Sequence, residues 1–115
     1  MQITVSGRHF EVTDALKAYV TEKAEKLERY YDRVRHVEVV FDEEAGSHVV
    51  EIIARADHHA TFVAKHDDHD AYASVDQVIK DLGRQLTRHK EKLRNRKHSG
   101  GRSDKHLLDE TASDE

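Results

Sequence analysis

The chain has 115 residues, of which 37% are charged and 37% apolar, and its formal net charge at pH 7 is −4. It contains no cysteine, which excludes disulfides, thiol nucleophiles and thiolate metal ligands. No apolar run approaches the ~18 residues that a membrane-spanning helix needs, and the N-terminus lacks the apolar segment of a signal peptide. We therefore expect a cytoplasmic protein without membrane contact.

Periodic apolar residues divide the chain into six elements. Alternation predicts four strands, over residues 2–6, 36–43, 48–56 and 61–66. Apolar residues three and four apart predict two helices, one from an N-cap at Thr13 to about Asp32 and one from a cap at Asp68 or Asp70 to about Lys97. The order is β-α-β-β-β-α. Because each helix has a single apolar stripe, we expect an α+β fold with both helices packed on one face of a four-stranded sheet.

The other face of this sheet is expected to be open to solvent. Its candidate residues form a mixed polar set with no aromatic pair for stacking nucleobases: Thr4, Glu38, Glu51 and Arg55. Gly46, between the second and third strands, can adopt a positive φ in a hairpin. Gly83 is the weak point of the last helix, where it costs ~1 kcal/mol relative to alanine.

Charge is distributed unevenly along the chain. Residues 1–79 have a net charge of −7, residues 80–102 of +7 and residues 103–115 of −4. This asymmetry indicates a polyanionic partner for the basic segment. We expect residues 1–97 to form the α+β domain and residues 98–115 to form a flexible, disordered acidic tail. This tail is either a solubilising end or a segment that folds back on the basic helix.

The basic residues of the last helix follow its helical spacing. Five are four residues apart and form one row, and three others widen it near the C-terminal end: Lys80, Arg84, Arg88, Lys92 and Arg96, with Lys90, Arg94 and Lys97. Neighbours in the row are ~6 Å apart, close to the spacing of phosphates along a nucleic-acid strand. The helix dipole explains cations only in the last turn. We therefore predict nucleic-acid binding, in preference to a solvated structural face.

Other clusters give weaker signals. Four histidines lie in or near predicted turns, but their spacing matches no zinc motif: His58, His59, His66 and His69. Adjacent acids at residues 42–44 are typical of a solvated hairpin, and Ser74 and Thr87 have no evident activating base. We expect no enzymatic activity, cofactor, bound metal or small-molecule substrate. The alternatives that stay open are a general RNA-binding protein and a metal-responsive protein that uses the histidine turns.

Two blocks of the sequence resemble a known family. The N-terminal "MQITVSGRHFEVTDALKAYVTEKAEKLERYYDRV" is similar to the opening of bacterial ribosome hibernation-promoting factors and ribosome-associated translation inhibitors. The segment "DAYASVDQVIKDLGRQLTRHKEKL" is similar to their characteristic stretch, which begins D-x-YAAID and continues through QL and KHK to KL. The resemblance covers residues 1 to about 97. One departure is Lys80–Asp81, where relatives often have the acid first and the lysine second.

The resemblance implies a function. Such proteins bind ribosomal RNA in the decoding channel of the small subunit, and there they block mRNA and tRNA. They preserve idle ribosomes under stress or in stationary phase. By position, the resemblance implicates in RNA binding Arg84, Arg88, His89, Lys90 and Lys92 of "RQLTRHKEK", Lys26 of "KLE", and Arg8.

The resemblance also bears on assembly. Long members carry a C-terminal dimerisation domain that this chain has no residues to build, so we expect a monomer off the ribosome. The acidic tail is similar in composition to that of short inhibitor-type members, which oppose ribosome dimers. Whether the chain promotes or prevents dimers stays open.

Overall fold

A computed structural model describes the backbone of residues 1–99 and the side chains of residues 1–95. The expected acidic tail therefore lies almost entirely outside the described residues, as do the side chains of Arg96 and Lys97. The elements are β1 (Gln2–Arg8), α1 (Asp14–Glu25), α2 (Leu27–Tyr30), β2 (Val34–Glu44), β3 (Ser47–Ala56), the 3₁₀ turn η1 (Asp57–His59), β4 (Thr61–Asp68) and α3 (Ala71–Ser99). In this part of the chain, none of the helices is long and apolar enough to cross a membrane.

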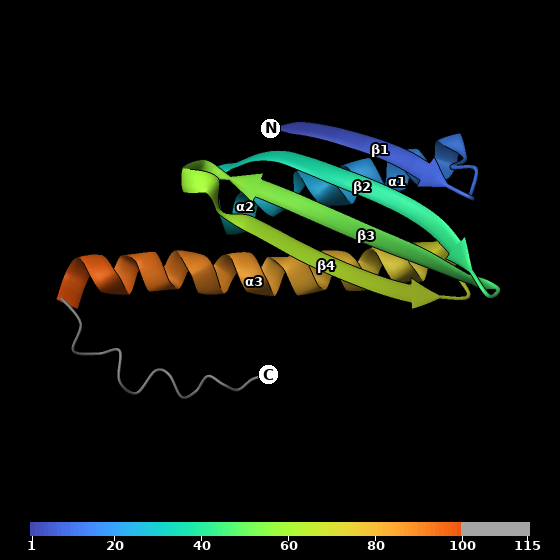
Figure 1. The fold of residues 1–115 in the computed structure, drawn as a ribbon. Helices are drawn as coiled ribbons and strands as arrows, with labels where there is room; N and C mark the ends of the chain where they lie inside the picture. Colours follow the sequence, from blue (N-terminus) through green and yellow to red (C-terminus); the bar gives the residue numbers. More distant parts are fainter. Residues whose placement is uncertain (100–115) are drawn as a thin grey trace.

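The four strands form one mixed sheet in the order β1-β2-β3-β4. β1 runs parallel to β2, which requires the crossover through α1 and α2, and the other pairs are antiparallel. All helices lie on the same side of the sheet (Figure 1). The predicted α+β fold with helices on one face is therefore confirmed.

The core lies between the sheet and the helices. β2 and β3 each turn alternate residues inward, and the fully buried ones include Val39, Phe41 and Ile52. α3 contributes Leu82 and Leu86, both with no exposed surface. Burying a side chain of this size contributes about 1.5–3 kcal/mol. The core therefore fixes α3 along the sheet and leaves its opposite side to solvent.

The first helix differs from the prediction of one helix to Asp32. α1 ends at Glu25, and Lys26 begins a tighter turn in which its N–H donates to Lys23 O and its carbonyl accepts from Arg29 N–H. Tyr31 already has extended geometry, with φ −159° and ψ 109°. The tightened turn keeps Leu27 and Tyr31 buried under the sheet. The apolar spacing could not reveal it, because residues three apart also share one face of a helix.

The ends of the elements follow local chemistry. Thr13 Oγ1 accepts a hydrogen bond from Leu16 N–H, and Asp70 Oδ1 accepts one from Tyr72 N–H, so Thr13 and Asp70 cap their helices as predicted. Gly46 has the expected positive φ of 82° in the hairpin between β2 and β3. Its neighbour Ala45 also has a positive φ, of 50°, a conformation that costs an alanine about 1–2 kcal/mol.

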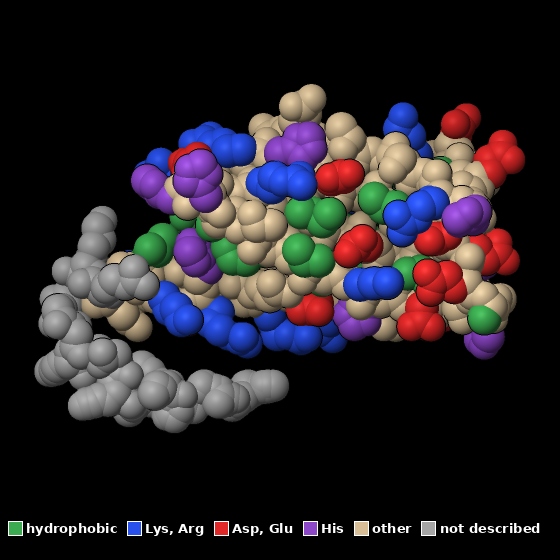
Figure 2. Space-filling model, in the orientation of Figure 1, with side chains coloured by type: hydrophobic (Ala, Val, Ile, Leu, Met, Phe, Trp, Pro, Cys, Tyr) green, Lys and Arg blue, Asp and Glu red, His purple; other side chains and the backbone are tan. Residues whose placement is uncertain are grey.

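The uncovered face of the sheet carries the expected polar residues together with apolar ones. Arg55 and Glu38 form an ion pair at 3.4 Å across β2 and β3. Ile53 of β3 is the register partner of both Glu38 and Val63, and the Val63 side chain is 46% exposed. Figure 2 shows apolar side chains near the middle of this face, among charged ones. The prediction of a mixed polar face was correct but incomplete.

Candidate nucleic-acid interface

The basic residues of α3 lie on its solvent side. Leu82 and Leu86 are buried against the sheet, whereas six cations of the helix are exposed: Lys80, Arg84, Arg88, Lys90, Lys92 and Arg94. We call these six residues the basic row. Figure 2 shows Lys and Arg side chains gathered along the edge of the molecule that α3 follows in Figure 1.

Within the described residues, the basic row has no internal counterion. Among the residues that the structure describes, no carboxylate lies within ion-pair distance of any of its six members. Four arginines outside the basic row do have carboxylate partners, among them Arg8 with Asp42 at 3.2 Å and Arg35 with Asp57 at 2.8 Å. Exposed cations held parallel by one helix and left unpaired repel one another unless an external anion compensates them. This makes the basic row the best candidate for a polyanion site.

Three other predicted residues lie in different surroundings. Lys26 is exposed at the junction of α1 and α2. His89 is half-buried, and its ring contacts the rings of Tyr31 and Phe62 at 5.1 Å in both cases. Arg8 lies at the end of β1, beside Asp42. The structure thus brings His89 into the layer between α3 and the sheet and leaves Arg8 apart from the basic row.

Arg8 belongs to the acidic end of the molecule. Its partner Asp42 is paired in the sheet with Val49, the neighbour of His48. The His48 carbonyl accepts a hydrogen bond of 2.9 Å from Ser74 Oγ, in the first turns of α3. Burial favours a higher pKa for Asp42, but the Glu43 backbone N–H, Arg8 and His9 outweigh it and hold the pKa below its ordinary value. Arg8 thus neutralises an internal carboxylate.

Acidic residues gather where α3 begins and β4 ends: Glu43, Glu44, Asp67, Asp68, Asp70 and Asp76. Figure 2 shows acidic side chains gathered at the end of the visible face where β4 ends in Figure 1. Tyr19 donates a hydrogen bond of 2.7 Å to Asp76, and this bond, with partial burial and nearby acids, raises the pKa of Tyr19. The described part of the molecule is therefore strongly dipolar, with acidic side chains at the start of α3 and basic ones along the rest of the helix.

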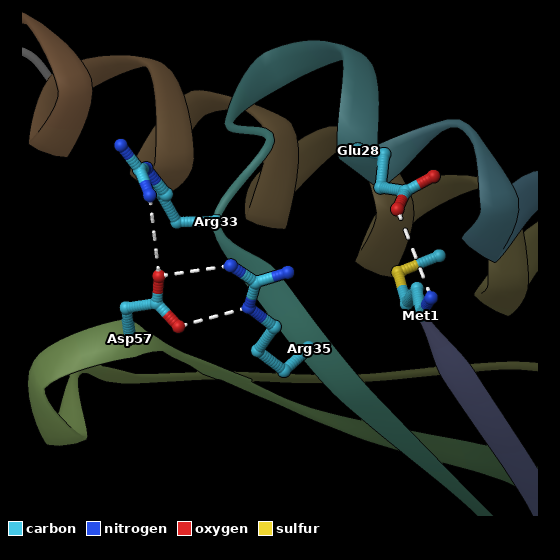
Figure 3. Close-up of polar contacts among 5 residues, drawn as sticks. All are labelled: Met1, Glu28, Arg33, Arg35 and Asp57. Atoms are coloured by element: carbon cyan, nitrogen blue, oxygen red, sulfur yellow. Dashed lines mark hydrogen bonds and ion pairs between the residues drawn. The ribbon is translucent and has the colours of Figure 1, made fainter.

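A second charged cluster closes the end of the sheet nearest the C-terminal half of α3. Asp57 of η1 accepts hydrogen bonds from Arg35 Nε at 2.8 Å and Arg35 Nη2 at 3.1 Å, and Arg33 approaches it at 3.6 Å (Figure 3). Nearby, the N-terminal ammonium of Met1 lies 3.8 Å from Glu28. These pairs tie η1 to β2 and the N-terminus to α2.

The histidine turns do not come together. His58 and His59 lie in η1 at one end of β4, whereas His66 and His69 lie at its other end, and His66 Nε2 contacts Asp81 Oδ2 at 3.3 Å. The two pairs of histidines thus lie toward opposite ends of β4, a strand of eight residues. Over the described part of the chain, no three histidine or acidic side chains are placed to hold one metal ion.

The structure also places an aromatic residue at the basic row that the sequence did not indicate. Tyr30 of α2 lines a shallow groove with Lys80, Arg84 and Arg88. Sequence reasoning assigned Tyr30 to a continuous first helix. Its contact with α3 is a long-range packing relationship, with no signal in local spacing.

Comparison with known proteins identifies the family. Residues 3–94 match the family model described as "Sigma 54 modulation protein / S30EA ribosomal protein". The chain is 38% identical over 94 residues to the ribosome hibernation promoting factor of Salmonella typhimurium, which covers 82% of this chain and 98% of that protein. It is 40% identical over 92 residues to the factor of the same name from Azotobacter vinelandii, covering 80% of this chain and 85% of the relative.

Solved structures agree on the fold. The N-terminal domain of Thermus thermophilus Protein Y superposes with a TM-score of 0.71 at 30% identity, covering 77% of this chain and 99% of that one. A ribosomal subunit interface protein from Coxiella burnetii superposes with a TM-score of 0.74 at 21% identity, covering 79% of this chain and 99% of that one. With the family model matched over most of its length, this chain belongs to the Sigma 54 modulation protein / S30EA ribosomal protein family.

Proposed function

We propose that this protein is a ribosome hibernation factor. It binds ribosomal RNA of the small subunit in the decoding channel, and there it excludes mRNA and tRNA by occupying their space. Idle ribosomes are thereby kept inactive and intact under stress or in stationary phase. The observation that carries the proposal is the basic row of α3, which has no counterion among the described residues, in a chain whose relatives are named ribosome hibernation promoting factors. Such a partner places the protein in the bacterial cytoplasm.

The proposed mechanism requires a rigid domain with one RNA-binding surface, and it involves no chemical step. Burial of Leu82 and Leu86 fixes α3 along the sheet, so the cations of the basic row keep their spacing before RNA is met. The remaining predicted contacts, Lys26, Arg96 and Lys97, would extend this surface. About five to eight phosphate contacts would make binding fall steeply with salt, by about 0.7–0.9 in log K per unit log salt for each phosphate.

The dipolar charge sets the orientation on the subunit. Phosphates attract the C-terminal half of α3 and repel the acidic end around Asp70 and Asp76. A monomer would therefore enter the RNA channel with its basic side against the RNA walls. Arg8, which is occupied by Asp42, is the weakest member of the predicted contact set.

Sucrose-gradient sedimentation tests the proposal. Purified bacterial small subunits and whole ribosomes are sedimented with the full chain at low and at moderate salt. Comigration with both particles, lost as salt rises and competed by mRNA with tRNA, is the expected result. The position of the ribosome peak shows in the same run whether dimers form or are suppressed. Protein that remains at the top of the gradient at low salt would falsify the proposal.

The same experiment separates a general RNA-binding protein from a ribosome-specific one. Bulk transfer RNA is added in excess as a competitor. A channel-specific factor stays with the small subunit, because many phosphates contact it in one fixed arrangement. A general RNA binder is stripped from the particle in proportion to the competitor.

A further inference from the structure

Tyr30 is an exposed aromatic side chain beside the basic row. Its side chain is 41% exposed, although it lies at the contact between α2 and α3. The ring lines a hollow of about 360 Å³ whose other walls all come from α3: Lys80, Gly83, Arg84, Thr87, Arg88 and Glu91. An aromatic ring thus lies among three cations that have no counterion in the described part of the chain, at the surface proposed to meet RNA.

Gly83 determines where this ring lies. A Cβ built at Gly83 would come within 3.1 Å of both Cε2 and Cζ of Tyr30, a distance tighter than ordinary van der Waals contact. The absence of a side chain at Gly83 therefore lets the ring rest directly on the helix. A glycine inside a helix lowers helix stability by ~1 kcal/mol relative to alanine. At this position it allows Tyr30 to pack closely against α3.

The tyrosine hydroxyl has no hydrogen-bond partner among the residues that the structure describes. Tyr19, by contrast, donates to Asp76 at 2.7 Å. A partly exposed ring with a free hydroxyl, flanked by guanidinium groups, suits one ligand chemistry well. An unpaired base stacks on the ring, the hydroxyl reaches ribose or phosphate, and the arginines contact the flanking phosphates.

We propose that Tyr30, seated on Gly83, is a stacking site for an unpaired ribosomal RNA base whose neighbouring phosphates contact Arg84 and Arg88. This inference rests on the proposed function and specifies the RNA that the basic row meets. A double helix offers only stacked, paired bases, so the site selects a single-stranded or bulged segment.

The test compares binding of full-length variants to purified small subunits over a range of salt. Tyr30→Ala is expected to weaken binding by roughly fivefold to 100-fold at every salt concentration, because one base loses its stacking partner. The slope of log K against log salt should stay that of the wild type, since a tyrosine neutralises no phosphate charge. Arg84→Ala should instead reduce the slope by about 0.7–0.9. Tyr30→Phe retains the ring and should bind nearly as the wild type does.

Two further variants control for the fold. Tyr72→Ala removes a tyrosine of similar exposure, 38%, which packs on Tyr19 at the acidic end of α3, and it should leave affinity unchanged. Gly83→Ala leaves Tyr30 in the chain but drives its ring from the helix, so affinity should fall while helix propensity rises. Circular dichroism checks that each variant is folded.

A second probe identifies the contact as a base. A single-stranded ribodecamer with one central 2-aminopurine should lose fluorescence on binding the wild type and Tyr30→Phe, and keep it with Tyr30→Ala. Equal subunit binding by the wild type and folded Tyr30→Ala would overturn the stacking site and leave the proposed function standing. Weaker subunit binding by Tyr30→Ala with unchanged quenching would also overturn it, since Tyr30 would then contact a ribosomal protein. A wild type that binds no subunit removes the proposed function itself.

Discussion

Arg35 donates two hydrogen bonds to Asp57, from Nε to Oδ1 at 2.8 Å and from Nη2 to Oδ2 at 3.1 Å. These bonds join the start of β2 to η1. The pKa of Asp57 is lowered chiefly by the hydrogen bond from Arg35, against partial desolvation, with further help from the charges of Arg35 and Arg33. The paired carboxylate is thus favoured in the folded state. Its contribution to stability depends on pH.

Asp57→Asn should lower the free energy of unfolding at neutral pH. Because the folded pKa lies below the unfolded value of about 3.9, the stabilisation is complete above pH ~5 and is lost as pH falls through the folded pKa. The difference between wild type and variant should therefore be constant from pH 5 to 8 and vanish in acid. Urea unfolding at a series of pH values measures it.

Glu38→Gln is the matched control for this pair. Glu38 meets Arg55 through one contact at 3.4 Å, on the open face of the sheet. Its neutralisation should change stability less than that of Asp57, because a single exposed contact is weak. A pH-independent difference for Asp57→Asn would contradict the role of the charged pair.

Reversing Arg88, Lys90 and Lys92 to glutamate should abolish binding to small subunits while the fold persists. All three side chains are exposed and unpaired within the described residues, so no core contact is lost, and the change replaces attraction to phosphate by repulsion. Binding is measured by sedimentation, and the fold by circular dichroism. Retained binding by the folded variant would show that another surface meets RNA.

Single substitutions locate the effect. Arg88→Ala should reduce the slope of log K against log salt by about 0.7–0.9, the value for one lost phosphate. Lys17→Ala removes an exposed cation from α1, in a hollow lined by the acidic residues Asp14, Glu22 and Glu25, and should leave the slope unchanged. Equal effects of the two substitutions would mean that net charge alone governs binding.

Asp70→Ala should destabilise the protein by about 0.5–2 kcal/mol, because it removes the side-chain oxygen that accepts the Tyr72 N–H at the start of α3. Asp70→Asn keeps an acceptor and should cost much less. Thermal or urea unfolding of the two variants separates the cap from the charge. If both lose the same stability, the negative charge at the helix N-terminus, and not the cap, is what matters.

Local pattern was sufficient for most of the fold. The alternation of Val37, Val39 and Phe41 predicted β2, and the spacing of Val75, Ile79, Leu82 and Leu86 predicted the buried side of α3, because burial of one face imposes a period on the sequence. The same helical geometry predicted the basic row, because the residues of α3 that do not face the core lie on its solvent side.

Relationships between distant residues were not predictable in this way. The tight turn at Lys26 preserves the same-face spacing of a helix, so the apolar pattern could not reveal it. Tyr30 meets Gly83 across 53 positions, and Arg35 meets Asp57 across two strands. Such contacts depend on how the elements pack. The groove at the basic row therefore became visible only with the structure.

The hairpin between β2 and β3 offers a gain in stability. Ala45 and Gly46 both have positive φ, at 50° and 82°, the conformation that a two-residue type I′ turn requires. Asparagine tolerates this conformation much better than alanine does, so Ala45→Asn should raise the free energy of unfolding by roughly 0.5–1 kcal/mol.

Gly46→Ala is the opposite substitution at the same turn. No described atom lies within 4 Å of a Cβ at Gly46, so the cost of the alanine would come from backbone conformation and should be about 1 kcal/mol. Both variants lie far from the basic row, at the acidic end near Glu44, and should bind small subunits as the wild type does. Urea unfolding and sedimentation measure the two properties separately. A loss of subunit binding in either variant would place this hairpin in the interface and require α3 to lie on the RNA differently.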